Sequence, residues 1–408
     1  MELTPGLRRI APPDLEAVGQ DEDLAGRIHA EILRDGPITF ARFMELALYD
    51  PAGGYYRAEA ARPGREGDFL TAPETHPIFG ATLSRAFDEI WRRLDRPSRF
   101  VIREYGAGEG ALAVSILGGL RASGSGLSDA VRYQPVELDP RRIGAFMDRL
   151  SASGFGAAVE PSDATPISGV VLANEVLDAL PTHRVIARDG ALRELLVGSL
   201  DGRFVDVEAE PTTAGLAGRL AQEGLGLAVG QRAEICLELD GWLSHVATGL
   251  ERGVLLLIDY GYRAAELYDP VRRRDGTLRA YVRHRVHDDP YRHVGRQDLT
   301  AHVDVSAVER AAATAGLSHL GTTTQAEFLV GLGAQDLLQA IQADPATTLE
   351  GYLAVRSAVM RLLDPAAMGR FRVMGFGRAW PPGSPLAGFA YRLAPERRKP
   401  QGAAADQV

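Results

Sequence analysis

The first regular pattern of apolar residues lies near the N-terminus. Between residues 23 and 48, apolar side chains recur three or four positions apart, which is the spacing of one face of an α-helix: Leu24, Ile28, Ile32, Leu33, Phe40, Phe43, Met44 and Ala47. Gly36 and Pro37 interrupt this pattern, so we expect two short helices, with Thr39 as the N-cap of the second. Residues 1–22, rich in Pro and Gly at their start, are expected to form a flexible tail.

The segment 49–80 follows neither a helical nor a strand period, and we predict a long ordered loop there. Long segments of this kind inside a compact domain are often functional. A helical pattern resumes at residues 78–94. We therefore assign residues 23–95 to a helical N-terminal region whose loop covers a ligand.

From residue 96 onward, short apolar runs alternate with helical patterns. Four of these runs end in Gly, Asn or an acid, and they lie at residues 100–105, 133–138, 170–173 and 254–259. Further on we expect a helix at 305–315, a strand at 320–324, a helical region to 363 and a last strand, "RFRVMGFG", that closes the sheet. This alternation is typical of an α/β fold with an open, mostly parallel sheet covered by helices.

Two stretches interrupt this alternation. Residues 183–235 contain hairpin-like pieces with turns at "RDGA" and "LDGR", and residues 262–304 are polar and rich in Arg and His. We expect both to be insertions in a core that spans residues 96–380. Residues 395–408 are expected to form a disordered tail.

Composition and charge narrow the class of protein. The 408 residues are 45% apolar and 24% charged, as in ordinary globular proteins, and the net charge of −9 argues against general nucleic-acid binding. The single cysteine, Cys236, excludes an intramolecular disulfide and a cysteine-rich zinc site. No apolar run approaches the roughly 20 residues of a membrane span, and no secretory signal is present. We therefore expect a soluble, cytoplasmic protein without membrane insertion.

A glycine-rich turn follows the first apolar run of the core. In "EYGAGEG" the glycines are Gly106, Gly108 and Gly110, and Glu104 precedes them. Such a turn lets the backbone approach a ligand closely. The spacing differs from the dinucleotide fingerprint, which would need a glycine in place of Ala111. The pattern is that of class I methyltransferases that use S-adenosylmethionine, in which an acid such as Glu104 accepts from a water or from the ligand's ammonium group.

An acid at the end of the second run supports nucleoside binding. Glu137 follows the apolar run directly, and Asp139 comes two residues later. A carboxylate at this point accepts hydrogen bonds from ribose hydroxyls in methyl-donor and nicotinamide sites alike. We favour Glu137 for this role, while either acid could instead be a solvated charge at the strand end.

Polar side chains gather after two later strands. Asn174, Glu175 and Asp178 follow one strand, and the next delivers Asp259, Tyr260 and Tyr262. Ligands bind beyond the carboxyl ends of such strands, so we expect these side chains to face the reactive end of the cofactor, with Glu175 and Asp178 on one helical face. Alternatively, Asp178 caps a helix and Asp259 pairs with a neighbour.

Paired carboxylates suit the methylation of a guanidinium group. Methyl transfer is an in-line displacement that depends on positioning, and the guanidinium pKa above about 12 opposes simple deprotonation. Carboxylates can hold the guanidinium in a bidentate fork and offset its charge while a proton leaves. An amine acceptor would be served equally well.

Blocks spread over roughly residues 25–380 resemble the MidA family of S-adenosylmethionine-dependent methyltransferases, to which a mitochondrial complex I assembly factor belongs. They occur in the family's order: "ITFARFMELALYDPAGGYY", "DFLTAPETHPIFG", "EYGAGEG", "NEVLDALPTHR", "LLIDYGY", "GTLRAYVRHRVHDDP", "QDLTAHVDVSAV" and "TQAEFL". The resemblance implies a class I fold with a seven-stranded sheet and a helical N-terminal addition. It also implies symmetric dimethylation of arginine in a respiratory complex I subunit, as in the mitochondrial member.

By block position the resemblance implies donor binding by Gly106, Gly108, Gly110 and Glu137, with Asn174, Glu175 and Asp178 lining the reaction centre. Two departures stand out: Tyr105 and Ala107 replace the family's Leu and Pro, and "ELDP" replaces Glu-Pro-Ser. Neither removes a group that donor binding needs.

The remaining polar blocks extend this hypothesis. "DFLTAPE" offers Asp68, Thr71 and Glu74 in a loop that could close over the donor, with Thr71 as a donor contact. The histidines of the second insertion match no zinc spacing, so we expect no metal: His284, His287, His293 and His302. Of these, His302 is expected near the catalytic acids, together with Asp259.

These observations predict a methyltransferase that acts on arginine in a partner protein, with S-adenosyl-L-methionine as cofactor. Three alternatives stay open: methylation of a small amine, an assembly chaperone that binds the donor without catalysis, and a nicotinamide oxidoreductase. The apolar helical region near 330–363 is either core or the face of a homodimer.

Overall fold

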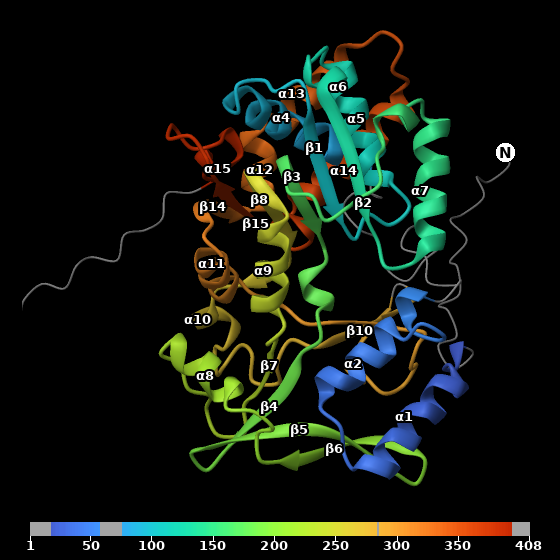
Figure 1. Cartoon of the computed structure of the whole chain (residues 1–408), viewed down its shortest axis with the longest axis vertical. Coiled ribbons are helices and arrows are strands. Elements are labelled where there is room, and N and C mark those ends of the chain that lie inside the picture. Colours follow the sequence, from blue (N-terminus) through green and yellow to red (C-terminus); the bar gives the residue numbers. More distant parts are fainter. Residues whose placement is uncertain (1–17, 58–75, 284, 394–408) are drawn as a thin grey trace, which may run out of the picture.

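A six-stranded sheet forms the centre of the molecule (Figure 1), for which a computed structural model describes residues 18–57, 76–283 and 285–393. Its strand order is β14-β15-β8-β3-β1-β2. Four strands run parallel: β1 (Phe100–Tyr105), β2 (Val131–Val136), β3 (Ile167–Asn174) and β8 (Leu250–Asp259). Two run antiparallel to their neighbours: β14 (Ser318–Thr324) and β15 (Arg372–Arg378). The predicted α/β class with a mostly parallel sheet is confirmed.

Two details of the predicted sheet are wrong. The described sheet has six strands where seven were expected, and beyond β2 only an isolated parallel bridge joins Tyr133 to Val159. Pro161 and Pro166 flank the chain that follows this bridge, and proline cannot donate to a ladder. The last strand, β15, lies between β8 and β14 and does not close the sheet at its edge.

Helices cover both faces of this sheet. Alternate residues of β1 point to opposite sides, so Phe100 and Ile102 join one core and Val101 joins the other. The first core includes α4 (Ile78–Arg93), α5 (Ala111–Ala122) and α7 (Pro140–Ala152), and the second includes α9 (Leu239–Thr248) and α11 (Val305–Thr314). Burial on both faces explains why the parallel strands are almost wholly apolar.

The predicted N-terminal helices are α1 (Glu22–Asp35) and α2 (Phe40–Tyr49). Thr39 caps α2 as expected, since its hydroxyl accepts from the Arg42 N–H at 3.1 Å. Both helices pack on a second, antiparallel sheet of order β6-β5-β4-β7, which residues 183–235 form: β4 (His183–Arg188), β5 (Ala191–Leu200), β6 (Arg203–Ala209) and β7 (Arg232–Ile235). A backbone bridge between Ile38 and Val197 ties the helical segment to this sheet.

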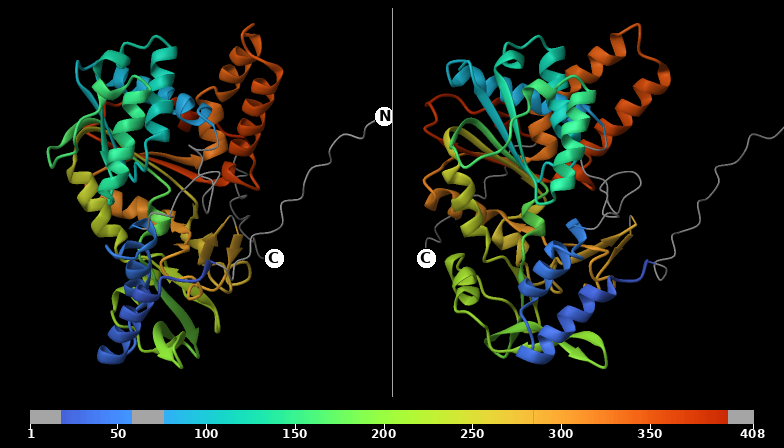
Figure 2. Two further views of the ribbon diagram at one scale, coloured as in Figure 1. Left: turned by 90° about the vertical axis from the view of Figure 1, so that its right-hand side faces the viewer. Right: turned by 45° about the vertical axis from the view of Figure 1, so that its right-hand side comes forward.

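The segment 261–304, most of which was expected to be an insertion, adds short strands next to the end of β8. It forms β9 (Gly261–Tyr262), β10 (Arg279–Val282), β11 (Arg285–His287), β12 (Asp298–Thr300) and β13 (Val303–Asp304). The other helices are α6 (Leu127–Ala130), α8 (Gly215–Gln222), α10 (Ala264–Leu267), α12 (Gln325–Gly331), α13 (Ala334–Ala343), α14 (Leu349–Leu363) and α15 (Ala387–Ala390). Figure 2 shows the α13–α14 hairpin standing out from the body of the molecule.

Across the described part of the chain, none of the helices has both the length and the apolar character needed to cross a membrane. The expected terminal tails fall largely on residues 1–17 and 394–408, which lie outside the described residues.

Candidate functional site

A cavity of about 510 Å³ opens at the carboxyl ends of β1, β2 and β3. Figure 1 shows α2 beside this edge of the sheet. The cavity joins the glycine turn to the N-terminal helices and to α9, and its polar and aromatic lining includes Glu45, Tyr49, Tyr56, Arg57, Glu104, Glu109, Glu137, Arg142, Arg149, Asn174, Glu175, Glu238 and Trp242. This set contains six acidic side chains and three arginines. The cavity is therefore suited to a cationic ligand.

The glycine turn forms one wall of the cavity. Gly106, Gly108 and Gly110 all have positive φ, at 68°, 54° and 85°. A Cβ at Gly106 would lie 2.8 Å from Val176 Cγ2, and a Cβ at Gly110 would lie 2.7 Å from Leu150 Cδ2. A Cβ at Gly108 would meet no atom of the described residues within 4 Å. Packing therefore requires glycine at the outer two positions, whereas the middle one leaves room on the cavity side.

Glu104 lies at the base of this wall. It is 3% exposed, and its Oε2 accepts a 2.6 Å hydrogen bond from the Tyr133 hydroxyl. Burial raises the pKa of the Glu104 carboxyl to about 8. At neutral pH and without a bound cation, the protonated form of Glu104 is thus favoured. A cationic group beside Glu104 would favour its ionised form.

The acids that follow β2 have different surroundings. Glu137 lines the cavity, where its Oε2 accepts from the Gly108 N–H at 3.0 Å and its Oε1 from the Leu138 N–H at 2.7 Å. Asp139 instead caps α7 through the Arg141 N–H and forms an ion pair with the Arg141 side chain at 2.9 Å. Of these two acids, Glu137 is the one that is placed to meet a ligand in the cavity.

Asn174 and Glu175 lie side by side in the lining after β3. The Asn174 Nδ2 donates to Glu175 Oε1 at 3.1 Å, while the buried Asn174 Oδ1 has no hydrogen-bond partner among the described residues. Glu175 has a φ of 54°, in the left-handed region of backbone conformation that residues other than glycine rarely adopt. Strained backbone of this kind concentrates at functional sites, where the surrounding structure maintains it.

Asp259 maintains this strained turn from behind. Its Oδ2 accepts from the backbone N–H groups of Val176, Leu177 and Asp178 at 3.2, 2.8 and 3.3 Å. Its side chain is buried at the end of β8, outside the cavity lining. The expectation that Asp259 faces the ligand is therefore corrected, because its carboxylate is used to hold the loop that presents Glu175.

Asp178 is also buried away from the cavity. It lies in a 3-10 turn (Leu177–Ala179), and Glu175 precedes that turn in a left-handed conformation, so the two acids do not share a helical face as expected. Burial raises the pKa of Asp178 to about 6, and a hydrogen bond from Tyr260 opposes this rise. The buried Asp178 therefore does not line the cavity.

His302 does not line the cavity, although it lies next to Ala301, whose N–H donates to the carbonyl of the buried Asp178 at 2.9 Å. Its ring packs against Tyr260 and Tyr262, with centroids 5.4 Å apart in both pairs. Burial, together with nearby arginines, lowers its pKa to about 3. A neutral, enclosed imidazole outside the cavity is not placed to act on a ligand there, so the expected catalytic position of His302 is corrected.

Sequence reasoning missed a second wall of the cavity. That wall consists of Glu45, Tyr49 and Tyr56 from the N-terminal region and Glu238 and Trp242 from α9 and the residue before it. The Tyr49 hydroxyl donates to the Ala179 carbonyl at 2.7 Å and so ties α2 to the loop after β3. The block "ITFARFMELALYDPAGGYY" contains the first three of these residues, but its apolar period alone does not indicate that it faces a ligand.

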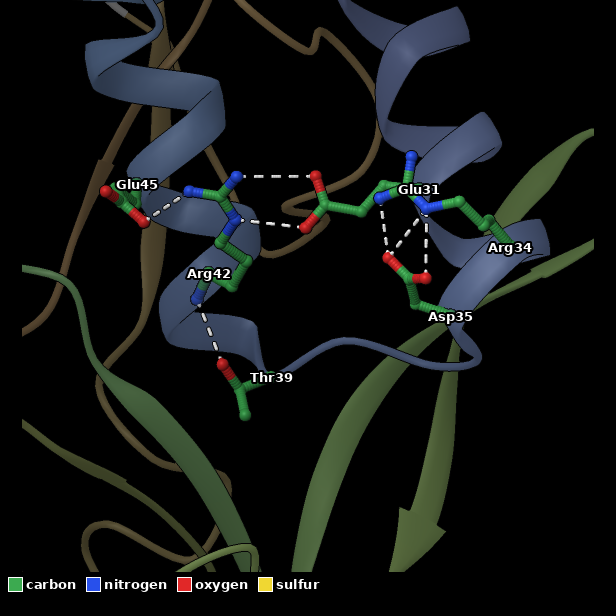
Figure 3. A network of polar contacts seen from close by, with 6 residues as sticks. All are labelled: Glu31, Arg34, Asp35, Thr39, Arg42 and Glu45. Carbon is green, nitrogen blue, oxygen red and sulfur yellow. Dashed lines mark hydrogen bonds and ion pairs between the residues drawn. The ribbon is translucent and has the colours of Figure 1, made fainter.

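Glu45, which lines the cavity, belongs to a polar network of α1 and α2 (Figure 3). Arg42 donates to Glu45 at 2.8 Å and to Glu31 of α1 at 3.0 Å. Glu238 is half-buried; burial and the nearby Glu45 charge raise its pKa. Although Arg42 pairs with Glu45, the Glu45 charge still raises the pKa of Glu238, and a cationic ligand beside Glu238 would favour its ionised form.

Several predicted residues lie outside the described residues. These are Asp68, Thr71, Glu74 and His284. Among the residues that the structure describes, no group of three or more His, Cys, Asp or Glu side chains is arranged to hold a metal ion.

The comparisons with known proteins agree with this geometry. Residues 82–323 match the family model described as "Putative S-adenosyl-L-methionine-dependent methyltransferase". The structure superposes with a TM-score of 0.83 on a Burkholderia thailandensis protein bound to S-adenosyl-homocysteine, at 36% identity over 93% of this chain and 98% of that one.

Curated relatives include the Drosophila melanogaster homolog of the protein arginine methyltransferase NDUFAF7, 31% identical over 86% of this chain and 84% of its own length. The human protein arginine methyltransferase NDUFAF7 is 27% identical over 74% of this chain and 71% of its own. Both relatives are named as mitochondrial, and this finding contradicts the expected cytoplasmic location.

The matches over most of the chain agree with the glycine turn and with the acid after β2. The chain belongs to this family of S-adenosyl-L-methionine-dependent methyltransferases.

Proposed function

We propose that the chain transfers a methyl group from S-adenosyl-L-methionine to an arginine side chain of a partner protein. The observation that carries the proposal is the 510 Å³ cavity, in which the glycine turn, Glu137 and the strained Glu175 share one acid-rich lining. The arginine methyltransferase names of the relatives support the choice of acceptor.

The donor fits the half of the cavity beside the glycine turn. The open space at Gly108 admits a ligand close to the backbone, Glu137 is available to ribose hydroxyls, and Glu104 to an ammonium group. When bound, the donor supplies a methyl group on a sulfonium centre. Its positive charge matches the excess of carboxylates in the lining.

The acceptor fits the other half, between Glu175 and the wall of Glu45, Tyr49 and Glu238. Asn174 and Glu175 offer oxygen atoms that can accept from guanidinium N–H groups, and Asn174 Oδ1 lacks a partner in the described residues. Glu175 would orient the guanidinium and offset its charge while the attacking nitrogen loses a proton. Asp259 would act through Glu175 as a positioning residue.

Labelled donor tests this function. The chain is incubated with methyl-labelled S-adenosyl-L-methionine and a cell lysate, and the variant Gly108→Arg, which fills the space beside the turn, is the control. We expect labelled protein with the wild type and none above background with the variant. Label that enters only small molecules, or no label despite measured donor binding, contradicts the proposal.

A further inference from the structure

A second, much smaller cavity lies where the loop after β3 meets α8, β7, α10, β13 and the start of α11. Its volume is about 30 Å³, and it shares no lining residue with the 510 Å³ cavity. Its lining mixes apolar, charged and other polar side chains: Leu177, Thr182, Arg219, Glu234, Cys236, Leu239, Leu267, Tyr268, Ala301, His302, Val303, Asp304 and Ala307.

Three buried polar atoms of this lining have no hydrogen-bond partner among the described residues. They are Arg219 Nη1, His302 Nδ1 and Asp304 Oδ2. The remaining atoms of the two charged groups are in use, because Arg219 Nη2 donates to Asp240 at 2.9 Å and Asp304 Oδ1 accepts from the Ala307 N–H at 3.1 Å. Arg219 is only 5% exposed. Leaving such atoms without a partner is costly, so a partner inside the cavity is expected.

The charges around the cavity favour a neutral occupant. Arg219 would repel a cation, whereas Asp304 and Glu234 would repel an anion. Glu234 Oε2 already accepts from the N–H and the hydroxyl of Thr277, at 2.6 and 3.0 Å. A water molecule can accept from Arg219 and donate to Asp304, and a cavity of about 30 Å³ has room for roughly one or two water molecules.

We propose that one or two ordered water molecules fill this cavity and bridge Arg219 Nη1, His302 Nδ1 and Asp304 Oδ2. Internal water of this kind makes about three hydrogen bonds to groups that the protein leaves unsatisfied. The bridge joins α8 to the start of α11, which Asp304 caps. Leu177, two residues after Glu175, lies in the same lining, so the bridge also lies against the loop that presents Glu175.

A high-resolution crystal structure of the full chain tests the proposal directly. We expect water density in the cavity, with each of the three atoms at hydrogen-bond distance from a water molecule. Crystals grown in rubidium bromide check the assignment, because both ions scatter anomalously, and no anomalous peak should lie in the cavity. An empty cavity, a direct contact between Arg219 and Asp304, or an anomalous peak at this place overturns the proposal.

Oxygen-17 relaxation dispersion tests the proposal in solution, because its amplitude counts internal water molecules that exchange slowly. Ala307→Val adds two methyl groups to the cavity wall and should lower this amplitude by the share of roughly one or two water molecules. The matched control is Ala313→Val, at an exposed position of the same helix, which should leave the amplitude unchanged. Binding of S-adenosyl-homocysteine checks that both variants are folded. Equal amplitudes in the two variants overturn the proposal.

Discussion

At the scale of single residues, Glu175 combines a strained backbone with a position in the cavity. Glycine adopts a φ of 54° without strain, so Glu175→Gly should keep or raise the free energy of unfolding, by up to about 1 kcal/mol. Methyl transfer should fall at least about a hundredfold, because the carboxylate is lost. Urea denaturation and labelled-donor assays measure the two effects.

Asp201→Gly is the matched control for this variant. Asp201 also has a positive φ, 49°, but it lies in an exposed turn between β5 and β6, away from the cavity. The control should gain stability similarly and keep full activity. If both variants retain activity, the role assigned to Glu175 is wrong.

Glu104 makes donor binding and stability depend on pH. Burial raises its pKa from the ordinary 4.5 to about 8, so between these pH values the folded chain keeps a proton that the unfolded chain has lost. The free energy of unfolding should therefore fall as pH rises through this window, and Glu104→Gln should reduce the dependence. Denaturation curves at several pH values measure it.

The same carboxyl should link donor binding to proton release. An ammonium group needs the ionised carboxylate, so affinity for S-adenosyl-homocysteine should increase between about pH 6 and pH 8. Calorimetry in buffers of different ionisation enthalpy detects the released proton. An affinity that stays constant over this range would remove Glu104 from the ligand site.

At the scale of elements, two glycines of the same turn have different roles: Gly108 leaves space for the donor, whereas Gly110 is required by packing. Gly108→Ala adds a methyl group that no atom in the described part of the chain approaches within 4 Å, so it should lower donor affinity about tenfold by occupying the cavity, with a stability loss near 1 kcal/mol. Gly110→Ala adds a methyl group 2.7 Å from Leu150 Cδ2 and should cost about 2 kcal/mol or more in stability. Calorimetry and denaturation should rank the two variants in opposite orders.

Much of the element pattern could be predicted from local sequence. The apolar runs gave β1 at its observed residues and placed β2, β3 and β8 to within a few positions. The place of β15 inside the sheet could not be predicted, because strand order depends on contacts between distant segments. Glu175 and Asp178 were assigned to one helical face because their spacing suits a helix, whereas the hydrogen bonds to Asp259 impose a different turn.

At the scale of the whole molecule, the cavity depends on three parts of the chain that meet at one edge of the central sheet. The glycine turn and Glu175 come from the core, Glu45 and Tyr49 come from the N-terminal helices, and Glu238 lies just before α9. Spacing along the chain does not show that these parts meet. This is why the wall of Glu45, Tyr49 and Glu238 escaped sequence reasoning, whereas the glycine turn and Glu137 did not.

Phe204 links the N-terminal helices to the second sheet. Its ring stacks on His29 with centroids 3.9 Å apart and meets the Phe43 ring at 5.3 Å. Phe204→Ala should lower the free energy of unfolding by about 3 kcal/mol, because it removes a buried ring from this junction. Leu200→Ala, in the same hairpin but 60% exposed, should change it by less than about 0.5 kcal/mol in denaturation experiments. Equal effects would mean that the junction contributes little to stability.

Mass spectrometry of the methylated products tests the proposed function of the cavity most directly. Proteins from a lysate are incubated with the chain and trideuteromethyl-labelled S-adenosyl-L-methionine, and the modified residues are identified by mass spectrometry. We expect the label on arginine side chains with the wild type and its loss with Glu175→Gln. Deuterated methyl groups on other residues only, or an arginine label that survives Glu175→Gln, would contradict the proposed cavity chemistry.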